Sequence, residues 1–215
     1  MTAGEEVVAG AAVLATHGLV DAFGHVSGRT GTQVLITPPL PLGRVVRTDA
    51  LVRLPSEGDA LPDGVPREAW IHRCVYARRL DVGGVCRAQP PSVLACDAAG
   101  IPIRALHGQG AFLGSEIAVH RDAALVRDHG RGEAVADALG DGHAIVLRGN
   151  GAVTVGSSPG RAVARMYVLE ASARINLAAA SIGTPTPLDG SELAAWERVA
   201  EELLGRLWDY LRSAD

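Results

Sequence analysis

The chain of 215 residues is poor in aromatic residues and cysteine. Aromatic residues make up 4% of it, so we expect a core built from small aliphatic side chains. The three cysteines, Cys74, Cys86 and Cys96, include no CxxC pair. An odd number of cysteines without that spacing indicates neither a disulfide framework nor a zinc knuckle.

Long apolar runs and clusters of basic residues are also missing. No apolar stretch approaches the roughly eighteen residues that read as a membrane-spanning helix. The net charge is −4 and the longest basic run is the pair Arg78–Arg79, so the cations that bind nucleic-acid phosphates are absent. Residues 1–6 are acidic, unlike the start of a signal peptide. We therefore expect a cytoplasmic protein that binds neither membranes nor nucleic acid.

Apolar periodicity predicts helices and strands that alternate along the chain. Ser158–Pro159 is a typical helix start, and Gly149-Asn150-Gly151 is typical of a hairpin turn. This alternation, without a repeat or a boundary, predicts a single α/β domain over residues 1–215 with a mixed sheet. Residues 183–190 should link it to a C-terminal helix at 191–212. The other predicted helices are 5–18, 67–79, 92–98 and 158–181, with one or two helices in 122–139. The predicted strands are 26–29, 33–37, 51–54, 82–86, 101–106, 117–119, 144–147 and 152–155.

Several segments resemble, in order, the class II aldolase and adducin head-domain family. The resemblance covers about residues 5–182. It implies a three-layer α-β-α single domain with a central mixed, mostly antiparallel sheet, and a homotetramer with sites at subunit interfaces. The segments are GLVDAFGHVSGR (18–29), LITP (35–38), EAWIH (68–72), DVGGVCRAQPPS (81–92) and VLRGNGAVTVG (146–156).

The residues that bind zinc in that family differ here. The family has a strand ending in His-Thr-His-Pro-Pro and a histidine in an Asn-His-Gly turn as zinc ligands, and a helix-opening glutamate as proton carrier. Alignment on Pro90–Pro91 places Arg87 and Gln89 at the first two histidines. Asn150 falls at the third, and Glu68 falls on the glutamate. Arginine has only donors and does not ligate zinc, so we predict a site with no metal and no cofactor.

This replacement has two interpretations, a decayed site or a repurposed one. In a repurposed site, Arg87 would bind a carboxylate or enolate oxyanion in place of the metal, with Gln89 and Asn150 as additional donors. A decayed site would be expected to lose Glu68 as well, and Glu68 is present. The sequence therefore favours repurposing.

The phosphate-binding positions of the family's sugar-phosphate aldolases also depart from the family pattern. His25 stands in place of an asparagine, Pro39–Leu40 in place of Ser-Gly, and Pro66–Arg67 in place of Ser-Ser. Small hydroxyls and glycine amides are what cradle a phosphate, so a sugar phosphate is not the expected substrate. The segment 24–29 resembles more closely a branch of the family that decarboxylates hydroxylated aromatic acids.

Five further residues have candidate roles in or near the site. His25 is a candidate second acid/base or a loop histidine that ties down the backbone. Ser27 and Arg29 are candidate substrate-binding residues, although Arg29 also suits a structural ion pair. His107, in a Gly-rich loop, is a candidate substrate contact, in this chain or in a neighbouring subunit. His72, four residues after Glu68, is interpreted as a hydrogen-bonding residue within the layer.

The leading hypothesis is a metal-independent lyase (decarboxylase, aldolase or dehydratase) acting on a small oxygenated carboxylate or keto substrate. Glu68 would be its acid/base and Arg87 its oxyanion stabiliser, with His25 as the second acid/base. One alternative is a catalytically silent binding or assembly module like the adducin head, which predicts no closed pocket around Glu68 and Arg87. Another is a metalloenzyme with non-standard ligands such as Glu68, His25 and His107.

Overall fold

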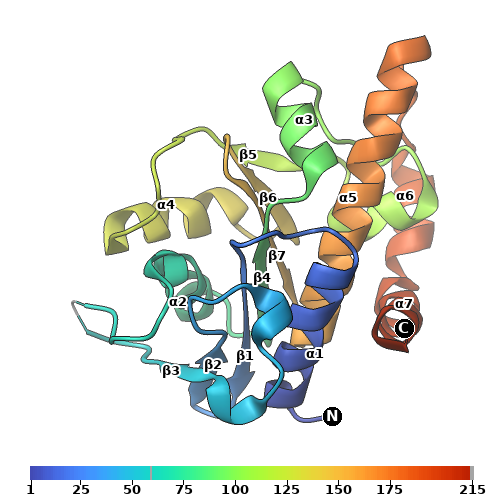
Figure 1. Ribbon diagram of the computed structural model, residues 1–215. Helices are drawn as coiled ribbons and strands as arrows, with labels where there is room; N and C mark the ends of the chain where they lie inside the picture. The colour runs from blue at the N-terminus through green and yellow to red at the C-terminus, as the bar shows by residue number, and fades with distance from the viewer. Residues whose placement is uncertain (59, 214–215) are drawn as a thin grey trace.

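A seven-stranded sheet forms the centre of the molecule (Figure 1). The computed structural model describes residues 1–58 and 60–213. The strands lie in the order β3-β2-β1-β4-β7-β6-β5, and every pair is antiparallel except β5 with β6, which is parallel. The mixed, mostly antiparallel sheet is thus confirmed. The strands are β1 (His25–Thr30), β2 (Gln33–Ile36), β3 (Val52–Leu54), β4 (Gly84–Ala88), β5 (Ala118–His120), β6 (Ala144–Leu147) and β7 (Gly151–Gly156).

Helices cover both faces of the sheet, so the domain has the expected three layers (Figure 1). One layer contains α1 (Ala3–Thr16), α3 (Pro91–Ala99), α5 (Pro159–Ile182) and α7 (Ala200–Ser213), and we call this side the α5 face. The other contains α2 (Trp70–Arg78) and α4 (His129–Leu139), and we call it the α2 face. The remaining helical segments are α6 (Gly190–Glu197) and the short 3-10 helices Leu42–Arg44, Thr48–Ala50, Arg67–Ala69 and Gly108–Leu113.

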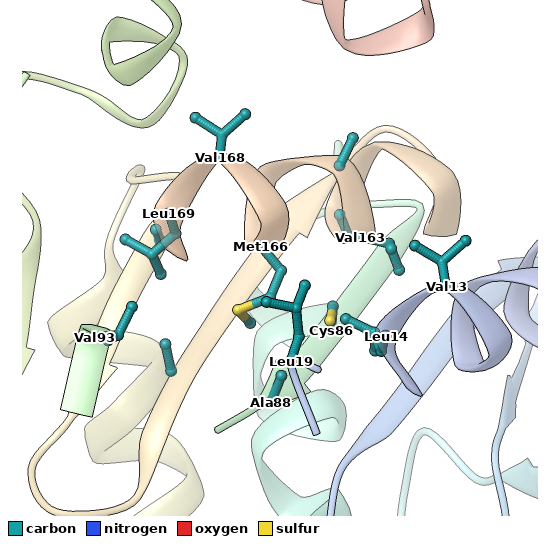
Figure 2. Close-up of a cluster of buried hydrophobic side chains, with 14 of the residues drawn as sticks. Val13, Leu14, Leu19, Cys86, Ala88, Val93, Val163, Met166, Val168 and Leu169 are labelled. Carbon is teal, nitrogen blue, oxygen red and sulfur yellow. The ribbon is translucent and has the colours of Figure 1, made fainter. Parts of the chain in front are cut away.

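The α5 face carries a core of small aliphatic side chains, as the composition predicted. Figure 2 shows Leu14 of α1 and Met166 of α5 in the middle of this cluster, with Leu169 of α5 on one side and Val13 of α1 on the other. Cys86 and Ala88 of β4 lie beneath them in the same cluster. Successive residues of a strand point to opposite faces. Val85 therefore packs in the second cluster, on the α2 face, and Arg87 points to that face as well.

Several helix starts follow from local sequence. Thr2 and Glu5 form a capping box at α1, each side chain bonding the other's backbone N–H. Ser158 caps α5 by accepting from the N–H of Arg161, and Pro159 occupies the first turn. Both helices begin within two residues of their predicted starts.

Four local predictions were wrong. Residues 122–128 are not helical, because the helix in this segment begins only at His129, where Asp128 caps it. Residues 101–106 form no strand, only an isolated bridge from Arg104 to Glu116, because Pro102 interrupts the run and cannot donate to a ladder. The predicted helix at 191–212 is two helices, since a turn at Arg198–Val199 separates α6 from α7. The Gly-rich segment 107–114 is not wholly loop, because it contains a 3-10 helix.

Of the helices in the described part of the chain, none is both long enough and apolar enough to cross a membrane.

Candidate active site

A cavity of about 640 Å³ lies on the α2 face, beside the ends of β1 and β4. We call its buried and half-buried polar residues the floor: His25, Glu68, Arg87, Gln89 and Asn150. We call its exposed residues Phe23, Pro39, Leu40, Arg67, Leu125 and Arg127 the rim. The cavity thus has a polar base and a largely apolar opening that carries two cations.

Arg87, Glu68 and Asn150 form one hydrogen-bonded network in the floor. The Nη2 of Arg87 lies 3.1 Å from Glu68 Oε2 and 2.5 Å from Asn150 Oδ1. The Nδ2 of Asn150 donates to Glu68 Oε1 at 3.0 Å, and Gln89 Nε2 donates to Asn150 Oδ1 at 3.3 Å. The four polar side chains that the sequence grouped through three separate segments are therefore in direct contact.

Three local structures hold this network in place. Arg87 is near the end of β4 and is only 2% exposed. Glu68 lies in the 3-10 turn that follows Pro66 and leads into α2. Asn150 is in the turn between β6 and β7, where Gly151 has φ +87°, and a Cβ there would lie 2.1 Å from the carbonyl oxygen of Ala88. Glycine at 151 is therefore required to bring Asn150 down onto the end of β4.

The Arg87 guanidinium is only partly paired within the protein. All of its hydrogen bonds among the described residues come from Nη2, and its buried Nε has no partner there. Burial lowers the pKa of Arg87, and the negative charge of Glu68 partly opposes that shift. A cation that is desolvated by the protein and only partly paired is suited to bind an anion.

His25 reaches the floor from the first residue of β1. It pairs directly with Arg87 across the β1–β4 ladder and is 4% exposed. Its Nδ1 lies 2.6 Å from His72 Nε2, and His72 Nδ1 lies 2.6 Å from the Ser27 hydroxyl. Burial, with smaller contributions from His72 and Arg87, lowers the pKa of His25 well below 6.5. Burial also lowers the pKa of His72 to about 3, so both rings are uncharged at neutral pH.

Three predicted substrate-binding residues do not line the cavity. Ser27 is fully buried under α2, where it bonds His72 and Tyr76. The guanidinium of Arg29 donates to three backbone carbonyls, including that of Tyr76 at 2.8 Å, and lies over the Tyr76 ring. His107 bonds Ser172 of α5, at 3.0 Å. Within one chain, Ser27 and Arg29 are structural and His107 is outside the site.

Half of the rim stands where the resemblance placed the family's phosphate-binding residues, namely Pro39, Leu40 and Arg67, whereas Phe23, Leu125 and Arg127 were not predicted from the sequence. Phe23 is 69% exposed and Leu125 is 45% exposed, and both line the cavity. Arg67 and Arg127 line it as well, and neither makes an ion pair within residues 1–58 and 60–213. Only the position of Phe23, two residues before His25, could have suggested its role. The segment with Leu125 and Arg127 reaches the cavity through tertiary folding alone.

The floor does not fit a zinc ion. A guanidinium has no lone pair to offer, and the carboxamide of Asn150 is already bonded to Arg87, Glu68 and Gln89. In the described part of the chain, no three His, Cys, Asp or Glu side chains converge as metal ligands. The alternative ligand set of Glu68, His25 and His107 does not converge either, because His107 is held at α5.

The sequence model of the class II aldolase and adducin N-terminal domain matches residues 5–177. The chain belongs to this family. A curated relative, the 3,4-dihydroxyphthalate decarboxylase of Rhodococcus jostii (strain RHA1), is 31% identical over 207 residues, covering 86% of this chain and 82% of that protein. The enzyme of the same name from Terrabacter sp. (strain DBF63) is 34% identical over 200 residues, covering 85% and 84%.

The fold is also that of solved class II aldolases. The L-fuculose 1-phosphate aldolase of Glaciozyma antarctica PI12 superposes with a TM-score of 0.80 at 20% identity, covering 97% of this chain and 87% of that one. The curated relatives and the family together support a lyase-type function, decarboxylase or aldolase.

Proposed function

We propose that this protein is a metal-independent lyase that decarboxylates a hydroxylated aromatic carboxylate. The observation that carries the proposal is the buried contact of Arg87 with Glu68 and Asn150 in the floor of the cavity. It places a cation, a proton carrier and amide groups within one hydrogen-bonded network. The names of the curated relatives support the reaction and the substrate class.

Arg87 would take the electrophilic role that zinc has elsewhere in the family. Decarboxylation of a hydroxylated ring develops charge on oxygen, and donors that are already oriented in a partly dry site stabilise such charge strongly. Arg87 has a buried guanidinium that lines the cavity, and Gln89 and Asn150 supply amide groups beside it. Glu68, within 3.1 Å of that guanidinium, would carry the proton.

The bonds can be followed through the proposed reaction. The Glu68 carboxylate first takes the phenolic proton, which leaves a phenolate oxygen bound by Arg87. The phenolate supplies an electron pair to the ring, and the carbon that bears the carboxylate takes that proton from Glu68. The bond from this carbon to the carboxylate then breaks, and CO₂ leaves. The electron pair of that bond restores the aromatic ring and the charge on oxygen, which Arg87 binds. Solvent then protonates the product phenolate, and Glu68 is a carboxylate again.

The rim suits an aromatic acid. Phe23, Leu40 and Leu125 present exposed apolar surface at the opening, against which a ring can pack. Arg67 and Arg127 are cations at the same opening and would bind a carboxylate that remains on the ring. A catalytically silent module would not need a cavity of this kind above a buried guanidinium, so the geometry favours an enzyme. We also propose a cytoplasmic homo-oligomer, a tetramer as in the family, in which His107 can contact a neighbouring subunit's site.

The test is CO₂ release from 3,4-dihydroxyphthalate and from singly carboxylated catechols, with metal content measured in the same preparation. We expect turnover that survives chelation. Glu68→Gln should lower kcat by roughly 100-fold or more with ligand binding kept, and Arg87→Ala should weaken carboxylate binding. Arg148→Ala, an exposed arginine outside the cavity, is the matched control. Full turnover by Glu68→Gln, unchanged binding by Arg87→Ala, or loss of activity on chelation would contradict the proposal.

A further inference from the structure

Four buried polar side chains form a continuous line from the cavity into the space between β1 and α2. We call this line the His25–Tyr76 chain. His25 Nδ1 meets His72 Nε2 at 2.6 Å, His72 Nδ1 meets the Ser27 hydroxyl at 2.6 Å, and Ser27 meets the Tyr76 hydroxyl at 2.9 Å. None of the four residues is more than 5% exposed. Only His25 lines the cavity.

Counting polar hydrogens leaves only two possible directions for these bonds. An uncharged imidazole has one N–H, and serine and tyrosine each have one O–H. The His25–Tyr76 chain therefore holds four polar hydrogens but only three hydrogen bonds, so one hydrogen is left over at one end. It is either the O–H of Tyr76, pointing away from Ser27, or the N–H at Nε2 of His25, pointing to the cavity.

The Tyr76 end has no place for the extra hydrogen. Among the described residues, the Ser27 hydroxyl is the one side-chain partner of the Tyr76 hydroxyl. A buried O–H without an acceptor costs about 1–3 kcal/mol. Burial raises the pKa of Tyr76, so the phenol keeps its proton and has to donate it to Ser27. Ser27 then donates to His72 Nδ1, and His72 Nε2 donates to His25 Nδ1.

We propose that His25 presents its Nε2–H to the cavity as a fixed, uncharged hydrogen-bond donor, and that His72, Ser27 and Tyr76 are positioning residues that hold this tautomer. The inference rests on the proposed function for its ligand, the oxyanion of a hydroxylated aromatic carboxylate. In this tautomer His25 has no lone pair directed to the cavity, so it cannot accept a proton there. His25 is then a second oxyanion donor beside Arg87, and acid/base chemistry falls to Glu68 alone.

The direct test is the tautomer itself, read by long-range ¹H–¹⁵N correlation spectra of the ¹⁵N-labelled full chain at pH 7. Spectra of the His25→Gln and His72→Gln variants assign the two rings. We expect both histidines to be uncharged with the proton on Nε2. A proton on Nδ1 of His25, or a charged ring, would overturn the inference.

Variants of the chain separate positioning from packing. In Ser27→Ala, His72 Nδ1 has no partner in either tautomer, so His72 no longer favours one tautomer over the other. Because the tautomer of His72 sets that of His25, the fraction of His25 in the Nε2–H form should fall to about half. Since only this form is competent, kcat/KM should fall by about twofold. Ser172→Ala is the matched control, because Ser172 is also a buried serine bonded to a histidine, on α5. It should leave the tautomer of His25 unchanged.

The conservative variant His72→Gln should keep His25 in the Nε2–H form. Its amide nitrogen can donate to His25 Nδ1 and its amide oxygen can accept from Ser27, whereas His72→Leu can do neither. An unchanged His25 tautomer in both Ser27→Ala and His72→Leu would overturn the positioning role. The spectra require no turnover, so this inference and the proposed function fail separately. An Nε2–H tautomer without decarboxylation contradicts only the function, and decarboxylation with an Nδ1–H tautomer contradicts only this inference.

Discussion

Both faces of the sheet carry buried apolar clusters, but they differ chemically at the cavity end of β4. On the α5 face, β4 contributes Cys86 and Ala88 to an aliphatic cluster with Met166 and Leu169 (Figure 2). On the α2 face, the same strand contributes Arg87, which is 2% exposed. Burying apolar surface stabilises the fold, whereas burying a guanidinium costs desolvation energy that one partner rarely repays. The α5 face therefore supplies stability, and the cavity end of the α2 face gives up stability to hold polar groups in place.

The strongest test of this contrast is Arg87→Met, which removes the charge and keeps much of the volume. If Arg87 serves function at the expense of stability, turnover should fall by about 1,000-fold, toward the upper range for loss of an oriented oxyanion donor. When Arg87→Met is combined with Glu68→Gln, so that no unpaired carboxylate is left, the melting temperature should stay level or rise, because burial disfavours this cation. Calorimetry of the double variant and a turnover assay of Arg87→Met check both halves. A melting temperature of the double variant lowered by many degrees would show that the arginine is structural.

The opposite result is expected from Met166→Ala on the α5 face. Met166 is fully buried in the aliphatic cluster, and truncation of such a residue costs about 2–5 kcal/mol of unfolding free energy. Urea denaturation measures that loss, while KM at permissive temperature should not change. Ile175→Ala, in the same helix but 38% exposed, is the control and should cost far less. A changed KM in Met166→Ala would mean that the two faces are not independent.

The α2 face should also make the protein sensitive to acid. His72 has a pKa of about 3 when folded and 6.5 as its ordinary value, so between these values the unfolded chain binds a proton that the folded chain does not. Stability is therefore complete above about pH 6.5 and falls as the pH is lowered, by about 1.4 kcal/mol per pH unit for one such histidine. From pH 7 to pH 5 the loss should be about 2 kcal/mol for His72, and His25 adds to it in the same direction.

Urea denaturation at several pH values measures this slope, and His72→Gln should flatten it. If the slope of the variant equals that of the wild type, His72 is charged in the folded state or is not the source of the acid sensitivity.

The α/β layers could be predicted from local sequence patterns, whereas the floor of the cavity could be predicted only from the family resemblance. Strand and helix patterns are local, so the α/β domain and its mixed sheet could be predicted, and the family resemblance supplied the mostly antiparallel order. The resemblance also grouped Glu68, Arg87 and Asn150, whose contact the structure then showed. The tertiary contacts of a side chain cannot be predicted from local sequence. Ser27 was therefore predicted to bind substrate, although it contacts α2. Its partners His72 and Tyr76 lie more than forty residues away.

A usable signal for the His25–Tyr76 chain was present in the sequence. His25 and Ser27 are two residues apart and point to the same face of a strand. His72 and Tyr76 are four residues apart and lie on the same face of a helix. Two polar pairs of this kind can meet only if the helix packs on that face of the strand, which is a tertiary fact. The rim cation Arg127 had no such pattern, since an exposed arginine is common on any surface.

The smallest expected effect comes from the turn that carries Asn150. Gly149 and Gly151 both have positive φ, +66° and +87°, but a Cβ at 149 meets nothing within 4 Å while a Cβ at 151 would strike the backbone of Ala88. Gly149→Ala should cost about 1 kcal/mol of stability from backbone conformation alone and leave turnover intact. Gly151→Ala should cost about 1–3 kcal/mol and lower turnover, because the clash moves Asn150 away from Arg87 and Glu68. Equal turnover in both variants would show that the Asn150 contact is dispensable, and the network in the floor would then reduce to the Arg87–Glu68 pair.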